Sequence, residues 1–130
     1  MKAFEVSADV SRHLLSITMR GFWDAATFDA FAIDFERALQ TLHRAGGCTY
    51  AIVDGREFAV QSREILGRFE NIMRANGPYL AKRTASIVPG ELNRMQAKRV
   101  TESLTRRDFT TMEDAEAWLF SDQAANGRAA

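Results

Sequence analysis

Nucleophilic and acid–base side chains in this 130-residue sequence are few and widely separated. A catalytic cysteine or serine needs a base within hydrogen-bond reach. Cys48 begins an apolar segment, His13 lies at a predicted hairpin and His43 near the end of a predicted helix. No Gly-x-Ser-x-Gly, Walker or Gly-x-Gly-x-x-Gly motif is present. We therefore expect no catalytic residues and no enzymatic activity.

Ser62 is the candidate phosphorylation site. It precedes a helically spaced apolar series, and a phosphate at a helix start is stabilised by free amides and the helix dipole. Arg56 and Arg63 lie close in sequence and would pair with that phosphate. A serine at this position is also a common N-cap, and capping alone explains the residue.

Asp54 follows the apolar run 48–53, where open α/β sheets place ligand-binding groups. A phosphorylated receiver site would need an acidic pair after the first strand to hold magnesium. Here the first strand ends in Ser7-Ala8-Asp9, and residues 88–91 lack the expected lysine, which excludes a receiver. The alternative is structural: Asp54 accepts hydrogen bonds from loop amides in an Asx-type turn.

Large apolar residues follow two of the predicted strands. Phe22 and Trp23 come after the second strand, and Phe58 stands in the loop after Asp54. Phe22, Trp23, Asp54 and Phe58 would then form a surface for a small apolar or lipid-like ligand, or a dimer patch. The alternative is that each aromatic side chain packs over its own helix as a hydrophobic staple.

The elements that position these residues are read from hydrophobic periodicity. Alternating or continuous apolar runs predict strands over 4–8, 14–20, 48–53, 84–88 and 108–110. Helical spacing with capping residues and glycine stops predicts helices over 24–45, 62–76, 92–104 and 111–119. The order β-β-α-β-α-β-α-β-α predicts an α/β fold: a mostly parallel five-stranded sheet with an antiparallel N-terminal edge hairpin and four packed helices.

Composition excludes several classes of function. The 17 basic and 17 acidic residues cancel, so we expect no attraction to nucleic acid. One cysteine allows no internal disulfide and fits a reducing cytoplasm, and two distant histidines make a metal site improbable. No apolar run is long enough to span a bilayer, and the N-terminus is unlike a signal peptide. We expect a cytoplasmic protein without cofactor or metal that is not an integral membrane protein.

Residues 4–120 resemble the SpoIIAA-like branch of the STAS superfamily, the anti-sigma-factor-antagonist fold. The resemblance rests on the hairpin before the first helix, the strand ending in Val53-Asp54, and the closing segment 108–119 with its capped helix and Trp-Leu pair. Classical members carry Asp-Ser-Ser-Gly at the switch, whereas this chain has Gln61-Ser62-Arg63-Glu64. The chain is therefore more similar to small bacterial SpoIIAA-like proteins of largely uncharacterised function.

These observations predict one SpoIIAA-like domain over residues 1–120 and a frayed tail over 121–130. The function that we expect is a non-catalytic regulatory or interaction module acting on a protein partner or as a homodimer. The alternative is binding of a small apolar or lipid-like ligand at the loops after the second and third strands. The third interpretation is an enzyme without a recognisable motif.

Overall fold

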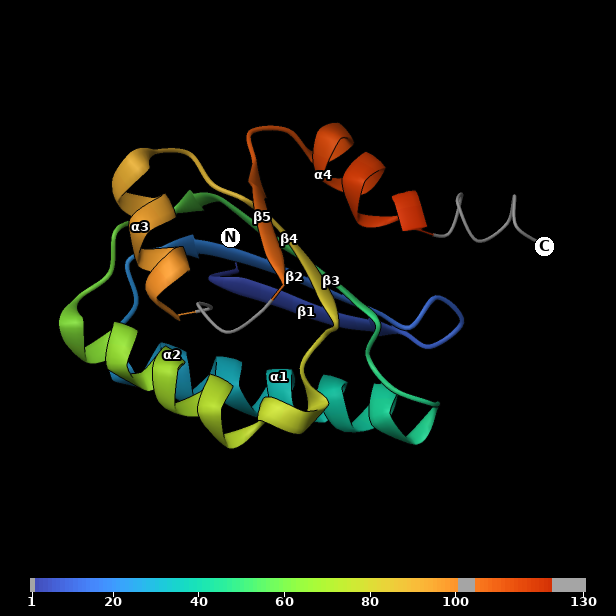
Figure 1. The fold of residues 1–130 in the computed structure, drawn as a ribbon. Coiled ribbons are helices and arrows are strands. Elements are labelled where there is room, and N and C mark those ends of the chain that lie inside the picture. The colour runs from blue at the N-terminus through green and yellow to red at the C-terminus, as the bar shows by residue number, and fades with distance from the viewer. Residues whose placement is uncertain (1, 101–104, 123–130) are drawn as a thin grey trace.

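The computed structural model describes residues 2–100 and 105–122, which form one mixed sheet with helices on both faces (Figure 1). The strands are β1 (Phe4–Asp9), β2 (Leu14–Gly21), β3 (Tyr50–Phe58), β4 (Arg83–Ile87) and β5 (Arg106–Phe109). Their spatial order is β1-β2-β3-β4-β5, with β1 antiparallel to β2 and every other pair parallel. The predicted sheet and its edge hairpin are confirmed.

The connections between parallel strands place three helices on the same face of the sheet. Successive parallel strands are added in one direction, so right-handed crossovers bring all the connecting helices to one side. These helices are α1 (Ala25–Arg44), α2 (Arg63–Ala75, followed by a 3₁₀ turn at Gly77–Tyr79) and α3 (Glu91–Val100). The last helix, α4 (Met112–Leu119), follows β5 and covers the opposite face (Figure 1).

Side-chain caps begin three of the helices where the sequence predicts them. The Asp24 carboxylate accepts a hydrogen bond from the Thr27 amide before α1, and Ser62 Oγ accepts one from the Ile65 amide before α2. Thr111 Oγ1 accepts a hydrogen bond from the Asp114 amide before α4. Each cap satisfies an amide that has no partner within its helix.

The third strand is longer than the sequence predicts. We expected a loop from Gly55 onward, but β3 continues to Phe58 and pairs with the end of β2. Thr18 is opposite Asp54 and Arg20 is opposite Glu57, so β3 holds one extra residue in a β-bulge. The bulge lets the strand continue although the apolar pattern stops at Val53.

The two faces of the sheet have separate hydrophobic cores. On the α1 side, rings from β1, α1, α2 and the segment after β2 make edge and stacked contacts, among them Phe4, Trp23, Phe28, Phe31 and Phe69. On the α4 side a smaller core consists of Leu14, Tyr50, Ile52, Ala85, Ile87, Ala115 and Leu119. Alternate residues of one strand therefore serve different cores.

The apolar residues whose helical spacing predicts α3 do not all face the sheet. Leu92 and Met95 are each 64% exposed, and α3 has no buried residue. The reason is that Asn93 and Gln96 turn inward to bind the end of β3 and the chain after it. The predicted helix residue Leu104 and most of the predicted tail lie outside the described residues.

Candidate functional site

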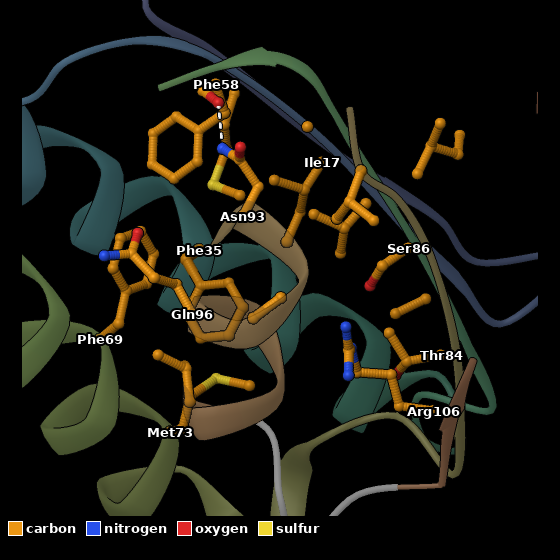
Figure 2. A pocket seen from close by; sticks show the side chains of 18 of the residues that line it. Ile17, Phe35, Phe58, Phe69, Met73, Thr84, Ser86, Asn93, Gln96 and Arg106 are labelled. Carbon is orange, nitrogen blue, oxygen red and sulfur yellow. Dashed lines mark hydrogen bonds between the residues drawn. The ribbon is translucent and has the colours of Figure 1, made fainter. Parts of the chain in front are cut away.

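An apolar cavity of about 140 Å³ lies between the sheet and the helices α1, α2 and α3 (Figure 2). An apolar cavity of about 150 Å³ is large enough to hold benzene. Most of its wall is hydrocarbon, aromatic or thioether, including Ile17, Phe35, Val53, Phe58, Phe69, Met73 and Val100. The size and lining suit a compact apolar molecule.

The cavity exists because two of the helices do not pack closely on the sheet. α1 packs on β1 and β2, and α4 packs on β3, β4 and β5. α2 and α3 make their principal contacts with helices instead, which leaves space above β3 and β4. On that side α3 presents Asn93, Gln96, Ala97 and Val100, at helical spacing, to the cavity.

Hydrogen bonds from two amide side chains hold α3 over the cavity. Asn93 Nδ2 donates to the Phe58 carbonyl at 2.7 Å (Figure 2). Gln96 Nε2 donates to the Gln61 carbonyl at 3.1 Å, and Gln96 Oε1 accepts from the Gln61 amide at 2.9 Å. Arg99 Nε also lies 2.9 Å from Glu70 Oε1 of α2, and Val100 packs partly buried against the core. α3 therefore forms a cover that is held mainly by polar contacts.

Gln61 joins this cover to the core. Its buried Oε1 accepts a hydrogen bond from the Trp23 amide at 2.9 Å. Its Nε2 donates to the carbonyls of Gly21 and Ala59 at 2.9 and 2.7 Å. One side chain therefore ties together the ends of β2 and β3, and its backbone holds Gln96 of α3.

One end of the cavity is polar. Thr84 and Ser86 are buried on the cavity face of β4, opposite Arg106 and Asp108 of β5 in the parallel register. Residues paired in this way point to the same face, so all four side chains lie on the cavity side. In Figure 2 the Arg106 guanidinium reaches inward beside Thr84 and Ser86.

Arg106 is a buried cation with an incomplete set of partners. Its side chain is 8% exposed, and its Nη2 donates to Asp108 Oδ1. Its buried Nε has no hydrogen-bond partner among the described residues. The Asp108 carboxylate is shared, since its Oδ2 lies 4.0 Å from Arg94 Nε.

The aromatic residues predicted to form one exposed surface lie in three different environments. Phe22 is 67% exposed, whereas Trp23 is 2% exposed and belongs to the core. Trp23 is buried because its amide binds Gln61, its Nε1 donates to the Arg20 carbonyl, and its ring contacts Phe69. The prediction of a shared exposed surface is therefore wrong for Trp23. Phe58 is half-buried and lines the cavity.

Asp54 takes part in the β3 bulge rather than in the cavity. Its carboxylate accepts hydrogen bonds from the Arg56 amide at 3.2 Å and from Arg56 Nε and Nη2. The Arg56 side chain thereby lowers the pKa of the Asp54 carboxyl. This geometry is the Asx-type role that the sequence analysis weighed. The sequence analysis expected the Arg56 guanidinium to pair with a phosphate on Ser62. In the structure this guanidinium binds Asp54, and the Ser62 side chain caps α2.

Cys48 and the histidines occupy structural positions. Burial raises the pKa of the Cys48 thiol to about 11, and its Sγ donates to the Tyr50 carbonyl at 3.5 Å. The His13 ring contacts the Gly47 carbonyl through Nδ1 at 3.1 Å, and the His43 ring packs on Tyr79. In residues 2–100 and 105–122, no three His, Cys, Asp or Glu side chains are grouped as metal ligands.

Apart from Phe58, sequence reasoning missed the residues that shape the cavity, although two patterns pointed to the polar ones. Strand 84–88 alternates Thr84 and Ser86 with apolar residues, which marks one face of a buried strand as polar. Asn93, Gln96 and Ala97 share a helix face that is polar and small. Arg106 lies two residues before the predicted edge strand 108–110, whereas β5 begins at Arg106, so no sequence signal marked it.

Comparison with known proteins identifies the fold. No protein-family model and no curated protein matches the chain. Among solved structures, the chain matches an uncharacterised protein of the DUF3478 family from Shewanella loihica PV-4, which has a SpoIIAA-like fold. The two chains superpose with a TM-score of 0.68 and share 23% sequence identity, and the match covers 92% of this chain and 95% of the other. Within the described ranges, no helix is both long and apolar enough to cross a membrane. The chain therefore has the SpoIIAA-like α/β fold, as its sequence predicts.

Proposed function

We propose that this chain is a non-catalytic module that binds a small apolar ligand in the cavity beneath α3. The observation that carries the proposal is the partly open apolar space of about 140 Å³ between the sheet and its helices. A well-packed domain rarely leaves such a volume empty, because its lining loses dispersion contacts. A ligand that fills the space restores them.

The position of the cavity refines the alternative function expected from the sequence. Phe58 and Ala59 line the cavity at the end of β3, but most of the remaining wall comes from β2, β3, β4 and the helices. α3 supplies a route of entry, because its inner face is held by amide hydrogen bonds and has no buried apolar anchor. Release of Asn93 and Gln96, together with the Arg99–Glu70 ion pair to α2, would expose the cavity.

Binding without catalysis is supported by the chemistry of the lining. Among the residues that the structure describes, the cavity wall contains no cysteine, histidine or carboxylate. Cys48 is a buried thiol whose raised pKa keeps it protonated near neutral pH. Neither the described lining nor Cys48 therefore offers an activated nucleophile to a bound molecule.

The proposal is tested by titrating ¹⁵N-labelled protein with 1-octanol and with octanoate. We expect chemical-shift changes for the amides of Ser86, Gln96 and Ala97, and saturation of these changes. Ala97→Phe should abolish binding by filling the cavity from the cover, whereas Met95→Phe on the exposed face of the same helix should not. Absence of saturable binding of both probes to the unmodified protein would overturn the proposal.

A second candidate is an interaction module that acts through protein contacts. It is favoured by the exposed apolar side chains Phe22, Leu92 and Met95, each more than half exposed. Exposed apolar residues of this size are common at contact sites. Sedimentation velocity over a range of concentrations tests self-association: a dimer that Phe22→Ser dissociates would support it, and a monomer at every concentration would exclude the homodimer.

A further inference from the structure

The structure assigns Arg106 as the receptor for the anionic head of the ligand, and we infer that the ligand is a small monocarboxylate with a compact apolar body. This inference rests on the proposed function, since it concerns the same cavity. It adds the chemical class of the ligand and the residue that selects it.

The first argument is the placement of the charge. Arg106 begins β5 on the face that looks into the cavity, and its guanidinium extends between Thr84, Ser86 and the apolar wall (Figure 2). An arginine cannot lose its charge in a protein, so burial of its side chain requires anionic or hydrogen-bonding partners. A solvent-exposed arginine would need no such partner, because water would solvate its charge.

The second argument is the partner that is absent. Nε of Arg106 is buried without a hydrogen-bond acceptor in the described part of the chain, although Nη2 is bound to Asp108. Asp108 cannot neutralise the site alone, because Arg94 approaches its other oxygen at 4.0 Å. Among the described residues, two guanidinium groups share this one carboxylate, which leaves one more cation than anion beside the cavity.

The third argument is shape. A guanidinium presents parallel donors that match the two oxygens of a carboxylate. Thr84 and Ser86 add hydroxyl groups on the same face of the sheet. A carboxylate next to Nε leaves the apolar part of the ligand against Phe35, Phe69 and Met73, across the cavity in Figure 2. The volume of about 140 Å³ limits that part to the size of one ring or a short alkyl chain.

The experiment compares each acid with its neutral amide, by calorimetric titration of the whole chain. The pairs are octanoate with octanamide and phenylacetate with phenylacetamide, which distinguish an alkyl body from an aromatic one. We expect at least one acid to bind ~10- to 100-fold more tightly than its amide, the range typical of a hydrogen bond to a charged group. This comparison uses the unmodified protein and depends on no variant.

Two variants locate the selectivity. Arg106→Met should retain binding of the amide and lose the preference for the acid, because methionine keeps apolar bulk without charge. Arg107→Met is the matched control, since Arg107 is the exposed neighbour whose guanidinium lies near the Phe109 ring, and it should keep the full preference. If Arg106→Met does not fold, the ¹H–¹⁵N resonance of Arg106 Nε in the unmodified protein replaces it, and we expect that resonance to shift with the acid and not with the amide.

The outcomes separate the inference from the proposed function. Acids and amides that bind with equal affinity would overturn the carboxylate assignment and leave the apolar cavity as the binding site. A preference for the acid that persists in Arg106→Met would also overturn the assignment. Failure of all four compounds to bind would overturn the proposed function, and with it this inference.

Discussion

The helices α3 and α4 both close a face of the same sheet, but they do so by different means. α4 buries Ala115 and Leu119 completely against Tyr50, Ile52, Ala85 and Ile87, so apolar packing holds it. α3 buries no residue, turns Leu92 and Met95 outward, and is fastened by the amides of Asn93 and Gln96.

This difference is already present in the strand beneath them. Ala85 and Ile87 of β4 face α4, whereas Thr84 and Ser86 face the cavity under α3. A sealed core needs complementary apolar surfaces on both sides, and the α4 side has them. The α3 side has polar groups at its edge and a void at its centre. We conclude that α4 completes the fold and that α3 covers a cavity.

The largest effect is expected from truncating the buried anchor of α4. Leu119→Ala should lower the free energy of unfolding by ~2–5 kcal/mol, because it leaves a cavity in a fully packed core. Leu92→Ala on the exposed face of α3 should change it by less than ~0.5 kcal/mol. Urea denaturation measures both, and similar losses for the two variants would remove the distinction between the helices.

Gln61 is the next most sensitive position, because it connects the cover to the core. Gln61→Ala removes the acceptor of the buried Trp23 amide and the donor to two carbonyls. The expected loss is ~1–3 kcal/mol, the cost of an unsatisfied buried group. Gln40→Ala on the exposed surface of α1 is the control, and an equally small effect at both positions would show that Gln61 is not a structural connection.

The caps of α2 and α4 should contribute similarly to the free energy of unfolding, although α2 borders the cavity and α4 does not. Ser62→Ala and Thr111→Ala each remove a side-chain acceptor from the first turn. Each should cost about 1 kcal/mol in denaturant unfolding. Unchanged stability in Ser62→Ala would contradict its role as a cap and leave phosphorylation as the remaining interpretation of that serine.

The effect that is smallest near neutral pH concerns Cys48, in the α1 core. Its pKa is raised by burial from 9.0 to about 11, so folding favours the protonated thiol. The associated stability is present below pH 9 and decreases as the pH rises toward 11. Cys48→Ala should reduce the loss of stability over that range. Rapid alkylation of the native protein by iodoacetamide at neutral pH would contradict a buried, protonated thiol.

Periodicity predicted the elements because each strand and helix has an apolar face of its own. The cavity could not be predicted in the same way, since its volume arises from the distances among three helices and the sheet. The spacing of Leu92 and Met95 predicts the helix but not its orientation, because hydrogen bonds from Asn93 and Gln96 decide which face of α3 turns inward. The caps at Ser62 and Thr111 were predictable because capping is local.

Native-state hydrogen exchange tests most directly whether α3 is a cover and α4 part of the core. The structure predicts that amides in the last turn of α3 exchange through a local opening, at a free energy at least ~2 kcal/mol below that of amides in the last turn of α4. The α4 amides should exchange near the global free energy of unfolding, as those of β4 should. Equal opening free energies for α3 and α4 would contradict the account, because both helices would then belong to one cooperative core.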